Sequence, residues 1–109
     1  MSSRRRVSAV VELWWSSWVP AVAPYAILLR LFIAGAMSAD EFEVVFLRLY
    51  KSDATDWPPE LFKVLDGLFA HVDDYCGDQT IRESIGGIDE ESLRTQCEVA
   101  LFKLRELAG

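Results

Sequence analysis

Four stretches of this 109-residue chain carry apolar residues at the spacing of an α-helix. In the most regular stretch, Phe42, Val45, Phe46, Leu49 and Tyr50 occupy positions i, i+3, i+4, i+7 and i+8. This period places them on one face of a helix, whereas a half-buried strand would alternate apolar and polar residues, and no stretch does so. The sequence therefore predicts an all-α protein.

Start and stop signals bound the first two helices. The first is expected to run from Pro24 to Gly35, because glycine adopts the left-handed conformation that commonly ends a helix. The second begins at an S-x-x-E capping box formed by Ser38 and Glu41, and it should extend to about Lys51. Local sequence signals therefore specify where the first helix ends and where the second helix begins.

The third helix should start at the Pro58-Pro59 pair and end near Tyr75, since proline is tolerated at the start of a helix. Residues 78–87 lack a sustained period and are predicted to form a loop. Asp89 then caps the fourth helix. Four amphipathic helices with mostly short connections pack most simply as an antiparallel four-helix bundle, which we expect to span residues 23–109 as one domain.

Residues 1–22 differ from the rest of the chain. A basic run, Arg4–Arg6, precedes an apolar stretch in which Glu12 is the only charge before Trp18. This order resembles a signal peptide, but the charge in the apolar stretch and Pro24 just after the A-x-A triplet argue against one. Charges and prolines also interrupt any membrane-spanning window of about 20 residues. We interpret residues 1–22 as an extra apolar helical segment; a wrongly assigned start codon is the alternative.

Charge is distributed unevenly along the chain. The net charge is -6, from 11 Lys+Arg and 17 Asp+Glu. Residues 1–37 contribute +3, so residues 38–109 carry −9. An acidic surface repels nucleic acids and anionic membranes and attracts basic partners. We therefore expect a basic protein as partner, with no direct binding of nucleic acid and no membrane partner.

Residue types that serve catalysis or metal binding are scarce. His71 is the only histidine, and Cys76 and Cys97 lack the spacing of a zinc site. The chain has neither a glycine-rich phosphate loop nor a nucleophile motif. The sequence thus predicts a protein that is not an enzyme and needs no metal or cofactor. Because Cys76 and Cys97 are expected to be free thiols, the sequence favours a location in the reducing cytoplasm.

Carboxylates gather between the end of the third predicted helix and the start of the fourth, where only Arg82 opposes them. Asp73 and Asp74 are placed at a helix C-terminus, where the helix dipole disfavours each negative charge by about 0.3–1 kcal/mol. Tyr75 beside them is of a type enriched in binding hot spots. A solvated rim would explain such acids, but the unfavourable placement indicates a binding surface. The residues of this cluster are Asp73, Asp74, Asp78, Glu83, Asp89, Glu90 and Glu91.

Three runs resemble the colicin D immunity family, the bacterial self-protective colicin-like immunity proteins: FIAGAMSADEFE (residues 32–43), LDGLFAHVDDY (65–75) and IDEESLR (88–94). The resemblance covers about residues 22–108. It implies a small four-helix bundle that blocks a cognate tRNase-type toxin by laying an acidic surface over the toxin's basic cleft. It also implies a monomer in a 1:1 complex.

The resemblance assigns particular residues to the toxin-binding surface. In the family, an acidic residue precedes by two positions an aromatic residue at the end of the third helix. The resemblance places this acidic residue at Asp73 and the aromatic residue at Tyr75. An acidic residue of the following loop falls on Asp78. Other nearby carboxylates would strengthen the electrostatic field. The expected toxin-binding residues are Asp73, Asp74, Tyr75, Asp78, Glu83 and Asp89.

Two other functions are compatible with the sequence. One is a helical adaptor that docks its N-terminal segment onto a partner through Trp14, Trp15 and Trp18. Deleting residues 1–22 would abolish binding by such an adaptor and spare an immunity protein. An enzyme built on the carboxylates is the third hypothesis, and it predicts a dependence on metal that chelation would reveal.

Overall fold

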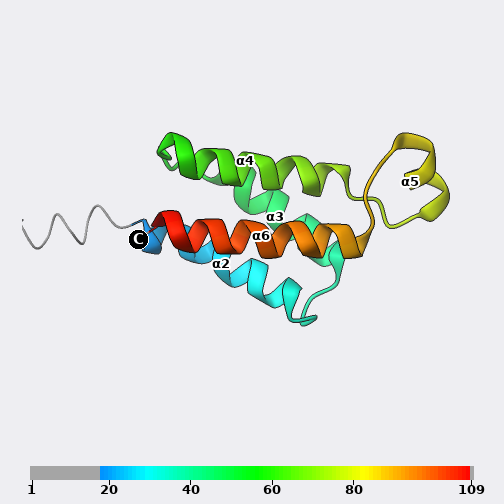
Figure 1. Cartoon of the computed structure of the whole chain (residues 1–109), viewed down its shortest axis with the longest axis horizontal. Helices are drawn as coiled ribbons and strands as arrows, with labels where there is room; N and C mark the ends of the chain where they lie inside the picture. Colours follow the sequence, from blue (N-terminus) through cyan, green and yellow to red (C-terminus); the bar gives the residue numbers. More distant parts are fainter. Residues whose placement is uncertain (1–17, 109) are drawn as a thin grey trace, which may run out of the picture.

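The computed structural model describes residues 18–108, which form five helices (Figure 1). Within these residues, β-type backbone pairing is limited to an isolated bridge between Tyr75 and Ile88. The all-α prediction is therefore confirmed. The part of the predicted N-terminal segment that covers residues 1–17 lies outside the described residues. The helices are α2 (Val19–Ile33), α3 (Ala39–Ser52), α4 (Pro59–Asp74), α5 (Gln79–Ile85) and α6 (Glu90–Ala108).

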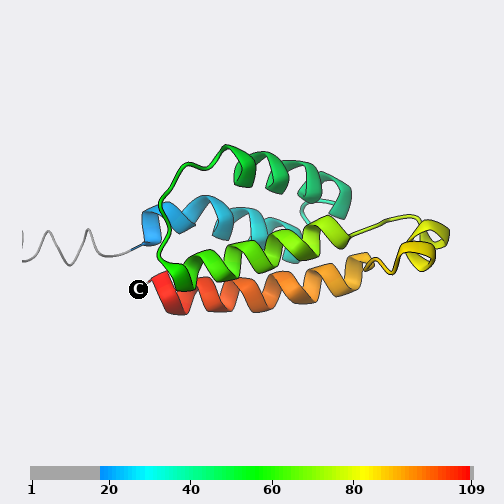
Figure 2. The same cartoon turned by 90° about the horizontal axis from the view of Figure 1, so that it is seen from above.

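The four long helices form an antiparallel bundle. Helix α6 packs along both α2 and α4, while α3 contacts α2 and α4 on the other side (Figure 2). Two short connections and the longer one that contains α5 lie at alternating ends and give this up-and-down order, as expected for amphipathic helices that share one core. Its fully buried side chains come from all four helices, and they include Leu29, Phe32, Phe42, Phe46, Leu61, Leu65, Val72, Leu93, Cys97 and Leu104.

The first helix begins at Val19 rather than at the predicted Pro24. Pro20 occupies one of the first two helical positions, where the missing N–H has no intrahelical partner to lose. Pro24 lies inside the helix and removes one backbone hydrogen bond. Tertiary contacts offset this loss, because Val22 is buried in the core and the Trp18 N–H donates to the Ala108 carbonyl at 3.0 Å.

The connection between α2 and α3 follows its sequence signals. Gly35 adopts a φ of 81°, in the left-handed region that favours glycine. The capping box is complete, since Ser38 Oγ accepts from the Glu41 N–H at 3.1 Å and the Glu41 carboxylate accepts from the Ser38 N–H at 2.9 Å. Both of these predictions are confirmed.

The prediction of a loop over residues 78–87 was wrong, because this segment contains helix α5. Asp78 Oδ1 accepts from the Ile81 N–H at 3.0 Å, and Gly86 ends the helix with a φ of 73°. No residue of α5 is buried. A helix without a buried face shows no apolar period, and only its two caps mark it in the sequence.

Candidate functional site

One end of the bundle gathers carboxylates from four helices. The start of α3, the end of α4, all of α5 and the start of α6 lie there, with α5 reaching beyond the other helices (Figures 1 and 2). We call these residues the acidic end. Its members are Asp40, Glu41, Glu43, Asp73, Asp74, Asp78, Glu83, Asp89, Glu90 and Glu91.

The acidic end holds the entire net charge of the described chain. Its ten carboxylates face two basic residues, Arg82 and Arg94, which leaves a charge of −8. Across the rest of residues 18–108, six carboxylates and six lysines and arginines cancel. The described protein is therefore strongly polarised, with one acidic end and a body of zero net charge.

Tyr75 lies among these carboxylates and links two helices. Its hydroxyl donates to Asp40 Oδ1 at 3.0 Å, so the end of α4 is tied to the start of α3. Partial burial, this hydrogen bond and the nearby Asp40, Glu90 and Glu43 carboxylates raise the pKa of Tyr75 to about 12. The phenol thus remains a neutral donor that holds Asp40 in place.

Glu43 shows how closely the carboxylates of α3 and α4 approach one another. Its pKa is raised, first by partial burial and then by the negative charges of Asp40 and Asp73. Asp40 and Glu43 were absent from the site expected from sequence. The predicted antiparallel topology could have identified these two residues, because it places the start of the second long helix beside the end of the third.

Three of the expected residues also have local structural roles. Asp78 caps α5, while Asp89 Oδ1 accepts from the Ser92 N–H at 2.8 Å at the start of α6. The hydrogen bond from the Ser92 N–H is the main reason that the pKa of Asp89 is lowered. Glu83 accepts from Gln79 Nε2 at 3.1 Å within α5. Their carboxylates are therefore held in fixed positions.

Asp73 and Asp74 occupy the last turn of α4 and are exposed. Their placement against the helix dipole, inferred from the sequence, is confirmed by the end of α4 at Asp74. The structure thus brings Asp73, Asp74 and Tyr75 to the same end as the caps Asp78 and Asp89. The expected residues share one region, although their contacts with a partner stay a prediction.

Both ends of the α5 segment are fastened to each other. The Ile88 N–H donates to the Asp74 carbonyl at 2.9 Å, and the Cys76 N–H donates to the Ile88 carbonyl at 3.0 Å. Arg82 turns back from α5 and donates to the Cys76 carbonyl at 2.9 Å. At Gly87 a Cβ atom would lie 2.6 Å from the Asp74 carbonyl oxygen, so this close approach requires glycine.

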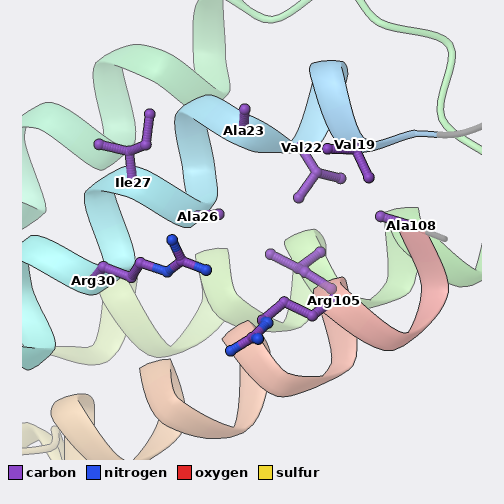
Figure 3. A pocket seen from close by; sticks show the side chains of 9 residues that line it. Val19, Val22, Ala23, Ala26, Ile27, Arg30, Arg105 and Ala108 are labelled. Carbon is purple, nitrogen blue, oxygen red and sulfur yellow. The ribbon is translucent and has the colours of Figure 1, made fainter.

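A groove of about 330 Å³ lies between α2 and α6, away from the acidic end (Figure 3). Small and apolar residues line it, and the guanidinium groups of Arg30 and Arg105 extend over it (Figure 3). Its lining contains no carboxylate, imidazole or thiol. Within residues 18–108, no group of three or more His, Cys, Asp or Glu side chains is placed so that it could hold a metal ion. The same residues include no helix with the length and hydropathy of a membrane span.

Comparison with known proteins adds one match. Residues 21–104 match a family model described as "Bacterial self-protective colicin-like immunity". This range contains α2 almost from its start, all of α3, α4 and α5, and most of α6. Searches of curated proteins and of solved structures found no significant match.

Proposed function

Because the chain belongs to the family of bacterial self-protective colicin-like immunity proteins, we propose that its acidic end inhibits a nuclease-type bacteriocin by covering the toxin's basic active-site cleft. The observation that carries this proposal is the charge of −8 at one end of a bundle that otherwise has no net charge. A toxin that cleaves RNA needs lysines and arginines to hold the phosphates. Carboxylates can occupy the same positions as those phosphates.

The polarised charge also supports rapid and oriented binding. A basic cleft is attracted to the acidic end at long range, and the attraction weakens as salt screens the charges. The neutral body does not compete for the cleft. Association of this kind is fast and sensitive to salt, which suits a protein that must intercept a toxin before it cuts RNA.

At short range, exposed carboxylates can accept charge-assisted hydrogen bonds from lysine and arginine. Asp73 and Asp74 are suited to this role because they are exposed at the end of α4. Asp78, Glu83 and Asp89 present carboxylates fixed by caps and by Gln79. We add Asp40 and Glu43 to the surface proposed to face the toxin, because they lie at the same acidic end.

The proposal includes a location and a stoichiometry. Cys76 and Cys97 are free thiols, which supports the reducing cytoplasm as the place where the protein acts. One acidic end per chain supports a monomer that binds one toxin domain. Sedimentation of the purified complex would measure this ratio.

The test reverses the charge of Asp73 and Asp74, because the helix dipole favours positive charge in the last turn of α4. An Asp73→Lys, Asp74→Lys variant places cations in the last turn of α4, so its folding should be preserved. The matched control, Asp56→Lys with Glu106→Lys, makes the same change in net charge on exposed residues of the neutral body. Both are assayed against the nuclease domain of the cognate bacteriocin, which is sought first among the products of genes adjacent to this chain's own.

We expect the α4 variant to associate at least about tenfold more slowly at low salt and to lose inhibition of RNA cleavage. The control should inhibit like the wild type. Equal inhibition by both variants would exclude Asp73 and Asp74 from the interface. Equal loss in both would show that the overall charge, rather than the acidic end, governs binding.

A further inference from the structure

Helix α5 carries two large apolar side chains that the bundle does not bury. Ile81 is 52% exposed and Ile85 is 66% exposed. Residues four positions apart lie on the same face of a helix, so the two side chains are neighbours. Since α5 lies beyond the end of the bundle (Figures 1 and 2), this isoleucine pair is presented at the tip of the acidic end.

The conformation of α5 is specified without the isoleucine pair. Asp78 caps its start, Gly86 ends it in the left-handed conformation, and Arg82 holds it to the Cys76 carbonyl. None of these interactions involves an apolar side chain. Ile81 and Ile85 are therefore available for contact with another molecule.

The pair lies at the acidic end, whose charge of −8 constrains what can cover it. Asp78 caps the same helix three residues before Ile81, whereas Glu83, two residues after Ile81, faces the opposite side of α5. A partner that covers this face must be apolar where it meets the isoleucines and basic around that point. An anionic membrane or a nucleic acid would meet repulsion from the carboxylates instead.

We infer that Ile81 and Ile85 insert into an apolar depression beside the basic cleft of the bacteriocin and set the lifetime of the complex. This inference rests on the proposed function. Charges act at long range and control how fast the two proteins meet, whereas desolvated apolar contacts act only after docking and control dissociation. Hot spots of protein interfaces are commonly such packed and desolvated contacts.

The experiment separates these two effects by measuring association and dissociation rates for the full chain and the same cognate toxin domain. The test variants are Ile81→Ala, Ile85→Ala and the double variant. The matched control is Ile27→Ala, which removes an isoleucine of similar exposure, 58%, from the α2–α6 groove. Thermal unfolding of each variant checks folding, and we expect no loss of stability for the α5 variants because neither side chain is buried.

The expected result is a dissociation rate about tenfold higher for each α5 variant, with an association rate and salt dependence close to those of the wild type. Unchanged dissociation from the α5 variants would overturn the inference, and the proposed function would stand if the Asp73→Lys, Asp74→Lys variant still bound slowly. Faster dissociation of Ile27→Ala alone would place the apolar contact in the α2–α6 groove instead. Wild-type protein that fails to bind the toxin domain would refute both proposals.

Discussion

The hydroxyl of Tyr75 and the Asp40 carboxylate form a 3.0 Å hydrogen bond that joins two helix ends separated by 35 residues in sequence. The other two tyrosines make equivalent contacts: Tyr25 donates to Asp53 Oδ2 at 2.7 Å, and Tyr50 donates to Asp66 Oδ1 at 3.1 Å. Each tyrosine therefore connects its helix to an aspartate of another element. These neutral donors allow carboxylates to lie against the bundle without a basic partner.

Replacing Tyr75 by Phe should remove the link between α4 and α3 while retaining the aromatic ring. We expect the free energy of unfolding to fall by about 0.5–1.5 kcal/mol at pH 7, the usual contribution of one hydrogen bond. Urea denaturation of the wild type and the variant would measure the difference. An unchanged midpoint would show that solvent replaces the contact at no cost.

Alkaline pH should destabilise the protein through its tyrosines. Burial and hydrogen bonding raise the pKa of Tyr75 to about 12, and they also raise the pKa values of Tyr25 and Tyr50. Because the unfolded tyrosines ionise near pH 10, this stabilisation is complete below about pH 10 and is lost as pH rises toward the folded-state values. Absorbance of tyrosinate should therefore increase together with the loss of helical circular dichroism. Tyrosinate formation near pH 10 in a folded protein would contradict this expectation.

Asp53 holds three donors at the connection between α3 and α4. Its carboxylate accepts from Tyr25, from the Trp57 indole at 3.0 Å and from the Thr55 N–H at 3.0 Å. Asp53→Ala would leave the buried Tyr25 hydroxyl without its acceptor, and we expect a loss of about 1–3 kcal/mol at pH 7. Asp56→Ala, an exposed aspartate of the same connection, is the control and should unfold like the wild type.

The contribution of Asp53 to the free energy of unfolding should depend on pH. Partial burial raises the pKa of this carboxyl, but the hydrogen bonds from Thr55, Tyr25 and Trp57 outweigh burial and lower it. The stabilisation is present above the unfolded-state pKa of about 3.9 and is lost as pH falls through the folded-state value. The difference in unfolding free energy between wild type and Asp53→Ala should therefore shrink below about pH 4. A constant difference would disprove the proposed linkage.

Gly87→Ala should loosen the joint at the base of α5, because its Cβ atom would lie 2.6 Å from the Asp74 carbonyl oxygen. We expect a cost of about 1–3 kcal/mol and faster hydrogen exchange at the Ile88 amide, which donates across this joint. Gly67→Ala is the control, since open space surrounds that position on α4. It should stabilise the protein by about 0.5–1 kcal/mol because alanine favours a helix.

Removing residues 1–17 should leave inhibition of the toxin unchanged, whereas an adaptor that binds through Trp14 and Trp15 would lose its partner. The deletion ends before Trp18, which packs against Trp57 with ring centroids 5.6 Å apart and is part of the bundle. A parallel assay of RNA cleavage with both forms would test this expectation. Loss of inhibition on deletion would show that residues 1–17 take part in binding the toxin.

Local signals made much of this fold predictable. The capping box of Ser38 and Glu41 depends on residues three apart, so the sequence shows it directly. The α5 helix was missed because it buries no side chain, and apolar periodicity reports only buried faces. Asp40 and Glu43 were missed for another reason: they join the acidic end through interactions with residues 30 or more positions away.

The paired backbone of Tyr75 and Ile88 has an evolutionary consequence. The chain leaves the bundle and returns to it at the same point, so residues 77–86 of the excursion can change without altering how the long helices pack, while Gly87 is kept at the joint. If this segment contacts the toxin as proposed, new toxin specificities can arise by mutating it on a constant framework, much as antibody loops vary on an invariant sandwich. Transplanting residues 77–86 between homologues is the engineering counterpart of that process.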